Sequence, residues 1–163
     1  MRVYLSKSEI AICNYVGKYR HFITSRQGTE RKQDTSLDSE QMSITGVLTE
    51  YSVAKMLNLF FDMNCDFRKF GADLESPELG LIDVKCAKTN GGNLNAVAWS
   101  ASKPCDAFVL TEIHHSHVLI VGWIESATLL HDSFLRDVGN GSFYSMPQTL
   151  LKKFDEQRYA QNL

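Results

Sequence analysis

The hydrophobic residues of this chain change their spacing near residue 62, and this change most narrowly limits the fold. Residues 44–62 repeat their apolar side chains with the period of an α-helix, whereas residues 72–87 alternate with a period of two. The apolar face of an amphipathic helix or of a half-buried strand must pack against another element to be buried. The pattern therefore predicts an α/β sandwich built on a mixed sheet.

The N-terminal residues contain a helix-start signal. The sequence Ser6-Lys7-Ser8-Glu9 fits a capping box, so we expect a helix over residues 7–19. Its apolar residues recur at spacings of three and four, which predicts one buried stripe. The stripe consists of Ile12, Cys13, Val16 and Tyr19. The polar residues 24–41 that follow are expected to form a long solvated loop.

The second half of the chain is expected to be mostly strands. Residues 72–76 and 81–87 are predicted to form a hairpin through the turn-forming residues 77–80. Further strands are expected over 97–100, 107–113, 118–123 and 143–145. A short helix is expected after residue 125, and Pro147 is expected to open a terminal helix that reaches residue 157. Trp99 and Trp123 fall within strand patterns, which favours core packing over base stacking.

The length of 163 residues suits a single domain that buries its own core. We divide it into an N-terminal helix and polar loop (1–43), a core (44–124) and C-terminal elements (125–163). Four scattered cysteines form no CxxC pair, so we expect reduced core residues rather than a zinc or disulfide framework. No segment has the apolar length of a membrane span or a secretory signal, so a cytoplasmic protein is expected.

The charge is distributed unevenly along the chain. Residues 1–33 carry seven Lys and Arg against two Glu, whereas residues 34–130 carry six basic and thirteen acidic residues. The net charge of −2 does not by itself indicate a nucleic-acid-binding protein. The asymmetry is nevertheless compatible with a basic arm that faces a polyanion beside an acidic, metal-binding centre.

Glu50 lies in the apolar stripe of the helix expected over residues 44–62. At about 100° per residue, an arc of roughly 80° contains Val47, Glu50, Ala54, Leu57 and Phe61. A carboxylate in such a stripe is costly to bury unless a cation, a metal or several donors meet it. Two interpretations stay open: a ligand of a site, or an acid at the helix border that is paired with Lys or Arg.

Three further residues are predicted to join Glu50. Asp83 and Lys85 are two apart on one expected strand and therefore share a face, while Asp73 lies on the preceding strand of the hairpin. Two or three carboxylates can hold Mg²⁺, which prefers oxygen ligands and lowers the pKa of a bound water. A neighbouring lysine can orient or deprotonate that water. The cluster therefore predicts phosphodiester hydrolysis.

These motifs resemble the PD-(D/E)XK nuclease superfamily. The resemblance implies its restriction-endonuclease-like fold, an α/β sandwich with a mixed central β-sheet flanked by helices. The resemblance lies in Thr49–Ala54, in Gly71-Ala72-Asp73 and in Leu81–Lys85, with Ala72 where the motif has proline. It implies cleavage of DNA with Mg²⁺ or Mn²⁺. It also implies that Asp73, Asp83, Glu50 and the Val84 carbonyl hold the metal, while Lys85 positions the water.

Several other residues carry weaker expectations. Glu75 and Glu78 lie close enough in sequence to substitute for an assigned ligand. His114, His115 and His117 form a histidine patch that we interpret as exposed turn residues, not as a zinc site. The expected rim of the cleft consists of Ser100, Lys103 and Asp106. The expected DNA contacts are Arg20, Arg26, Arg31, Lys32, Arg68, Lys69, Lys88 and Asn90.

The leading functional hypothesis is a small metal-dependent DNA endonuclease. Homing endonucleases, junction resolvases and phage-type nucleases of this family match the size, and the sequence does not separate them. One site cuts one strand, so a homodimer or homotetramer is expected for cutting both strands. The alternative is a catalytically inactive protein of the same fold that binds nucleic acid or a protein partner.

Overall fold

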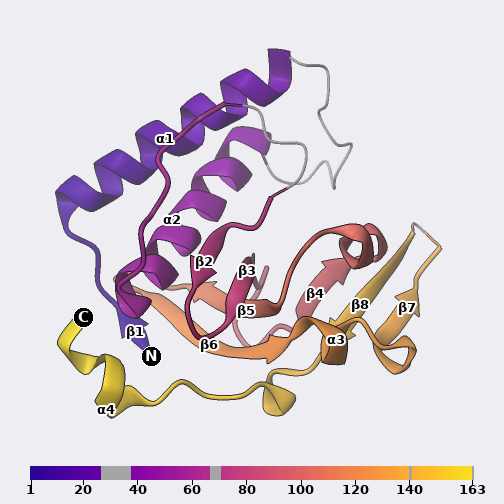
Figure 1. Cartoon of the computed structure of the whole chain (residues 1–163). Coiled ribbons are helices and arrows are strands. Elements are labelled where there is room, and N and C mark those ends of the chain that lie inside the picture. Colours follow the sequence, from indigo (N-terminus) through magenta and orange to yellow (C-terminus); the bar gives the residue numbers. More distant parts are fainter. Residues whose placement is uncertain (27–37, 67–70, 140, 163) are drawn as a thin grey trace.

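Two helices cover one face of a five-stranded β-sheet (Figure 1). The computed structural model describes residues 1–26, 38–66, 71–139 and 141–162. Helix α2 (Ser39–Leu57) lies between the outer helix α1 (Lys7–Arg26) and the sheet (Figure 1). Within the described residues, no helix has the apolar length that a bilayer crossing requires.

Helix α1 begins where the sequence predicts. Ser6 Oγ accepts a hydrogen bond from the Glu9 amide at 3.2 Å, and the Ser6 amide donates to Glu9 Oε2 at 2.6 Å. These two bonds confirm the capping box. The helix continues beyond the predicted end to Arg26. The loop expected over residues 24–41 is therefore wrong at residues 24–26 and 39–41, which are helical, and residues 27–37 lie outside the described residues.

The predicted buried stripe of α1 is only half right. Cys13 and Val16 are buried, whereas Ile12 and Tyr19 are 44% and 45% exposed. The face that is covered contains Gly17, where an added Cβ would lie 2.6 Å from the Ile44 Cα of α2. The missing side chain lets the two helices approach closely, and this contact sets which face of α1 is buried.

Helix α2 is shifted toward the N-terminus relative to the prediction over residues 44–62. It begins at Ser39 because the Asp38 side chain accepts a hydrogen bond from the Glu40 amide at 3.0 Å. It ends at Leu57 because Asn58 adopts the left-handed conformation, with φ of 53°. The Asn58 amide then donates to the last helical carbonyls, a common way to end a helix.

The main sheet is mixed, with strand order β1-β6-β5-β3-β2. Its strands are β1 (Arg2–Val3), β2 (Leu74–Ser76), β3 (Gly80–Cys86), β5 (Ala107–Ile113) and β6 (Val118–Glu125). Strands β3 and β5 are parallel, and the other pairs are antiparallel. The predicted hairpin is confirmed as β2–β3, and Gly80 at its turn has a φ of 67° that favours glycine.

A smaller antiparallel sheet lies beside the main one, with order β4-β8-β7. It comprises β4 (Leu94–Val97), β7 (Leu135–Asp137) and β8 (Ser142–Met146), and the short helix α3 (Ser126–Leu129) begins after residue 125 as predicted. The strand predicted over residues 97–100 is wrong. Residues 98–102 form a 3-10 helix that leaves Trp99 41% exposed, so Trp99 is not a core residue.

The predicted terminal helix over residues 147–157 is also wrong. After a 3-10 turn at Gln148–Leu150 the chain extends along the edge of β6, where Trp123 and Lys152 exchange two backbone hydrogen bonds of 2.9 Å. The sheet edge therefore binds the backbone groups that a helix would have used. Helix α4 (Glu156–Tyr159) forms only afterwards.

The core has two parts, one on each face of the main sheet. Val109 of β5 packs under the helices, while its neighbours Phe108 and Leu110 pack toward the smaller sheet. Strand β5 is thus buried on both faces, as a central strand beside a parallel neighbour should be. The coarse prediction of a mixed α/β fold is confirmed.

The four cysteines are free, as predicted. Only Cys13 among them is fully buried, so the prediction of core positions is wrong for Cys65, Cys86 and Cys105.

Candidate functional site

Strand β3 presents an acid and a lysine on one face. Asp83 is 2% exposed, and its Oδ1 accepts a hydrogen bond from Lys85 Nζ at 2.6 Å. Ile82 and Val84 point the other way, into the core under the helices. The predicted alternation along this strand is therefore confirmed, and it places Asp83 on the sheet face opposite α2.

Asp73 directly precedes β2 and is hydrogen-bonded to β3. Its amide donates to the Ile82 carbonyl at 2.9 Å, and its Oδ2 accepts the Val84 amide at 2.7 Å. Burial raises the pKa of Asp73 to about 8, helped by the negative charges of Glu50 and Asp83. Asp73 therefore lies within electrostatic range of both other acids, Glu50 of α2 and Asp83 of β3.

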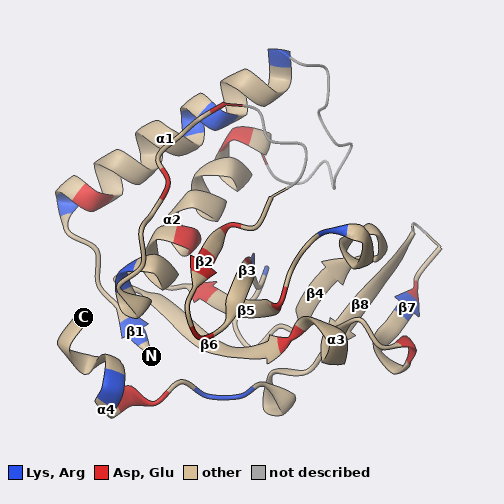
Figure 2. Cartoon of the chain, viewed as in Figure 1, with Lys and Arg blue, Asp and Glu red and all other residues tan. Residues whose placement is uncertain are grey.

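Glu50 of α2 is held by an arginine. Its side chain is 16% exposed, and its Oε2 lies 2.8 Å from Arg20 Nη1 of α1. The same guanidinium donates to the carbonyls of Asp62 at 2.7 Å and Asn64 at 3.3 Å. The interpretation of an acid paired with Lys or Arg thus describes Glu50, and Arg20, an expected DNA contact, is its partner. Figure 2 shows acidic positions on α2, on β2 and on the segment that leads into β2.

Sequence reasoning placed Lys103 only at the rim, but its ammonium reaches the acids. Lys103 Nζ lies 3.3 Å from Asp83 Oδ2 and 4.0 Å from Asp73 Oδ1, and its side chain is 12% exposed. Lys103 follows the 3-10 helix, and its amide donates to the Ser100 carbonyl at 3.1 Å. No local pattern could identify it, because Lys103 is 20 residues from Asp83 and meets it only through the fold.

The two aspartates respond differently to their surroundings. Burial acts to raise the pKa of Asp83, but the adjacent ammonium groups of Lys85 and Lys103 outweigh it and lower that pKa. Among the described residues no lysine lies at hydrogen-bonding distance from Asp73, where Lys103 Nζ is 4.0 Å away, and the pKa of Asp73 is raised. Asp83 therefore carries a stable negative charge, whereas Asp73 keeps its proton up to a pH of about 8.

The other acids and the histidines lie outside this cluster. Glu75 is exposed on β2, and Glu78 binds Arg158 and the Tyr159 hydroxyl. His114 Nε2 lies 3.2 Å from Glu112 Oε2, and the His114 ring stacks on the ring of His117. His115 is exposed. Among the residues that the structure describes, no group of three or more His, Cys, Asp or Glu side chains is arranged to hold a metal ion.

The expected DNA contacts are spread over several elements. Arg26 is exposed at the end of α1, where its guanidinium lies 4.6 Å from the Phe22 ring centre. Lys88 and Asn90 are exposed in the loop between β3 and β4, which buried Glu112 anchors by accepting the Gly91 amide at 2.7 Å. Four further expected contacts, namely Arg31, Lys32, Arg68 and Lys69, lie outside the described residues.

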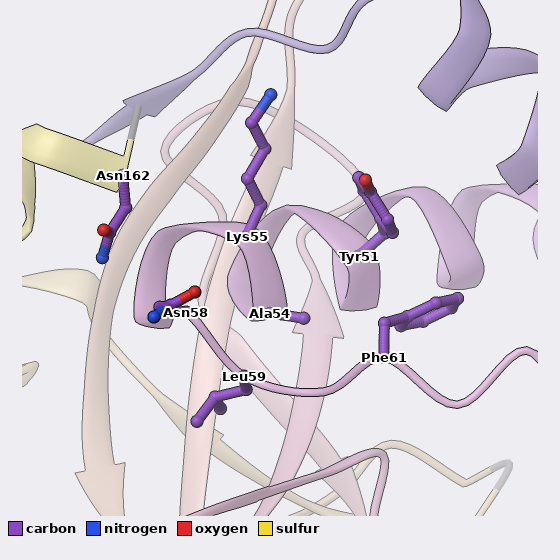
Figure 3. Close-up of a pocket in the computed structure, with 7 residues that line it drawn as sticks. All are labelled: Tyr51, Ala54, Lys55, Asn58, Leu59, Phe61 and Asn162. Carbon is purple, nitrogen blue, oxygen red and sulfur yellow. The ribbon is translucent and has the colours of Figure 1, made fainter.

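A pocket of about 240 Å³ lies at the C-terminal end of α2 (Figure 3). Tyr51, Asn58 and Asn162 are among the residues that line it, and none of the clustered acids does. The Lys55 side chain extends away from Asn58 in Figure 3, toward Glu9 Oε1 at 2.8 Å. The pocket is therefore separate from the acidic cluster.

Comparisons of this chain with protein-family models, with curated proteins and with solved structures found no match.

Proposed function

We propose that this protein is a metal-dependent DNA endonuclease of the PD-(D/E)XK type, acting as a homing endonuclease, junction resolvase or phage-type nuclease. The observation that carries the proposal is the partly buried carboxylate of Asp73 beside the Asp83–Lys85 pair of β3. Lys103 Nζ lies 4.0 Å from Asp73 Oδ1 and 3.3 Å from Asp83 Oδ2, and burial, together with the charges of Glu50 and Asp83, raises the pKa of Asp73 to about 8. Concentrating acids in this way destabilises a fold, and such clusters are typical of functional sites.

The chemistry of the acids suits a hard divalent cation. Asp73 and Asp83 would supply carboxylate oxygens, which Mg²⁺ and Mn²⁺ prefer, and a cation beside Asp73 would favour the ionised form that the raised pKa now disfavours. Glu50 would join them only by giving up its ion pair with Arg20. The Val84 amide already holds Asp73 in place; a role for the Val84 carbonyl as a ligand stays a prediction. When bound, such a cation would lower the pKa of a water and neutralise charge on the phosphoryl oxygens.

The chain's own residues would then position the reactants. Lys85 is 29% exposed, so its ammonium can keep one hydrogen bond to Asp83 and offer another to the attacking water. Asp83 fixes the lysine because it is almost fully buried and stays ionised. The exposed Lys88 and Asn90 follow directly on the same chain, where they can contact a phosphate. We further propose that two copies act together, so that both strands are cut.

A second candidate is a protein of the same fold that binds nucleic acid or a protein partner without catalysis. The ion pair between Glu50 and Arg20 favours it, because a helix acid whose role is structural needs no metal. The two candidates differ in what they require of Asp83 and Lys85: catalysis needs both side chains, and simple binding needs neither.

The decisive test incubates supercoiled plasmid and a labelled four-way junction with the protein in Mg²⁺, in Mn²⁺ and in EDTA. We expect cleavage of at least one substrate that disappears in EDTA and in the Asp83→Asn and Lys85→Met variants. Glu75→Gln is the matched control, because Glu75 is an exposed acid on the neighbouring strand. Its cleavage should equal that of the unaltered protein.

Two results would contradict the proposal. The first is the absence of cleavage of both substrates with either metal. The second is cleavage that persists unchanged in Asp83→Asn, which would locate the activity elsewhere. Retained DNA binding in a non-cleaving protein would instead support the binding candidate.

A further inference from the structure

The ammonium of Lys103 occupies the space between two acids to which the proposed function assigns a metal. It lies 3.3 Å from Asp83 Oδ2 and 4.0 Å from Asp73 Oδ1. Lys85 binds the other oxygen of Asp83, at 2.6 Å. Both oxygens of Asp83 are therefore already paired with a cation, and one of these cations also faces Asp73.

The two lysines are attached to the fold in different ways. Lys85 belongs to the central part of the sheet, and its carbonyl accepts a hydrogen bond from the Thr111 hydroxyl of β5 at 3.0 Å. Lys103 belongs to the connection before β5 and has an extended backbone, with φ of −92° and ψ of 133°. Its flexible stem therefore extends into the site from outside the strand, and can leave it by rotation of side-chain bonds alone.

A divalent cation and an ammonium cannot share the gap between Asp73 and Asp83. At contact distance the two positive charges repel strongly in a partly buried site, and they compete for the same oxygen atoms. Binding of one must therefore weaken binding of the other, and this coupling is reciprocal.

We propose that Lys103 is an internal counter-ion that competes with the divalent cation for Asp73 and Asp83. In the metal-free protein it neutralises the acids and keeps the fold stable. On metal binding its ammonium leaves the gap, so that the metal affinity of the protein is lower than the acids alone would give. This inference rests on the proposed function, since it assumes that the acids bind a metal.

The test measures metal affinity directly, by titration calorimetry of the full chain with MnCl₂ and with MgCl₂. Lys103→Met keeps the length of the side chain and removes the charge. We expect it to lower the apparent Kd for the metal by about tenfold or more, within the usual range of coupling between two ligands. Thermal unfolding in EDTA should show that the same variant is less stable than the unaltered protein.

Two further variants serve as controls. Lys18→Met removes one positive charge from a surface pair with Glu40, at 3.6 Å, and should leave the metal affinity unchanged. Lys103→Gln is a second neutral variant, which keeps the test decisive if Lys103→Met does not fold. Lys103→Arg retains the charge and should bind the metal no more tightly than the unaltered protein.

The outcomes separate this inference from the proposed nuclease function. Equal metal affinity in Lys103→Met and the unaltered protein overturns the role of Lys103 and leaves the nuclease proposal intact. Tighter metal binding by Lys103→Met without DNA cleavage by the unaltered protein supports the role of Lys103 and contradicts the nuclease. Absence of metal binding by every variant overturns both.

Discussion

Replacing Glu9 with glutamine tests the contact that joins the start of α1 to α2. The Glu9 carboxylate accepts the Ser6 amide, lies 2.8 Å from Lys55 Nζ, and accepts the Tyr51 hydroxyl at 3.1 Å. Burial acts to raise its pKa, but hydrogen bonds from Lys55 and Ser6 outweigh this and lower the pKa from 4.5 to about 2. Glutamine can still accept the Ser6 amide, so the substitution removes the charge and spares the capping box.

The expected magnitude follows from the pKa. The full shift would correspond to about 3 kcal/mol, but the side chain is 19% exposed and solvent screens part of the interaction. We therefore expect Glu9→Gln to reduce the free energy of unfolding by about 1 to 2 kcal/mol at neutral pH. Because the folded-state pKa is lowered, this stabilisation is complete above pH 4.5 and is lost as the pH falls toward about 2.

The assay is urea unfolding of both proteins across this pH range. The difference between them should be largest at neutral pH and should shrink steadily below pH 4.5. A Lys55→Met substitution should cost less in the Glu9→Gln background than alone, because the pair is already broken. A stability difference that does not change with pH, or additive effects of the two substitutions, would refute the reasoning.

Two further predictions concern stability. Asp73→Asn should stabilise the metal-free protein, because asparagine still accepts the Val84 amide and carries no charge. Since the folded-state pKa of Asp73 is raised, ionised aspartate destabilises the fold, and the difference in free energy of unfolding should grow as the pH rises from 3.8 toward about 8. Denaturant unfolding in EDTA measures this difference. Equal stability at all pH values would contradict this. Gly17→Ala should reduce the free energy of unfolding by about 1 to 3 kcal/mol, because the added Cβ would lie 2.6 Å from the Ile44 Cα. Gly46→Ala is the control, since its added Cβ would have its nearest contact at 3.8 Å and should not destabilise the protein. Denaturant unfolding of both variants compares them.

The sequence predicted best the parts of the fold that depend on local periodicity. The alternation along β3 correctly paired Asp83 with Lys85, and the hairpin turn correctly brought Asp73 to the same strand. The burial of Glu50 was also predicted, because its position in the apolar arc required a partner. Each of these predictions needed only neighbours within a helix or a hairpin.

The parts that were missed depend on contacts between distant segments. Arg20 is 30 residues from Glu50, and Lys103 is 20 from Asp83, so no spacing rule relates them. The terminal helix failed for the same reason, since the free edge of β6 lies far from residue 152 in sequence. Composition indicated that basic residues were present; the tertiary fold determined which of them became partners of the acids.

Arg20 makes three hydrogen bonds that include α1 in the proposed catalytic machinery, although α1 contains no residue of the motif. The Arg20 guanidinium binds Glu50 of α2 and also the carbonyls of Asp62 and Asn64, in the segment that follows α2. A residue of α1 thus ties the acid of α2 to the segment that follows that helix. A substitution of Arg20 would consequently disturb a proposed site to which α1 contributes no motif residue.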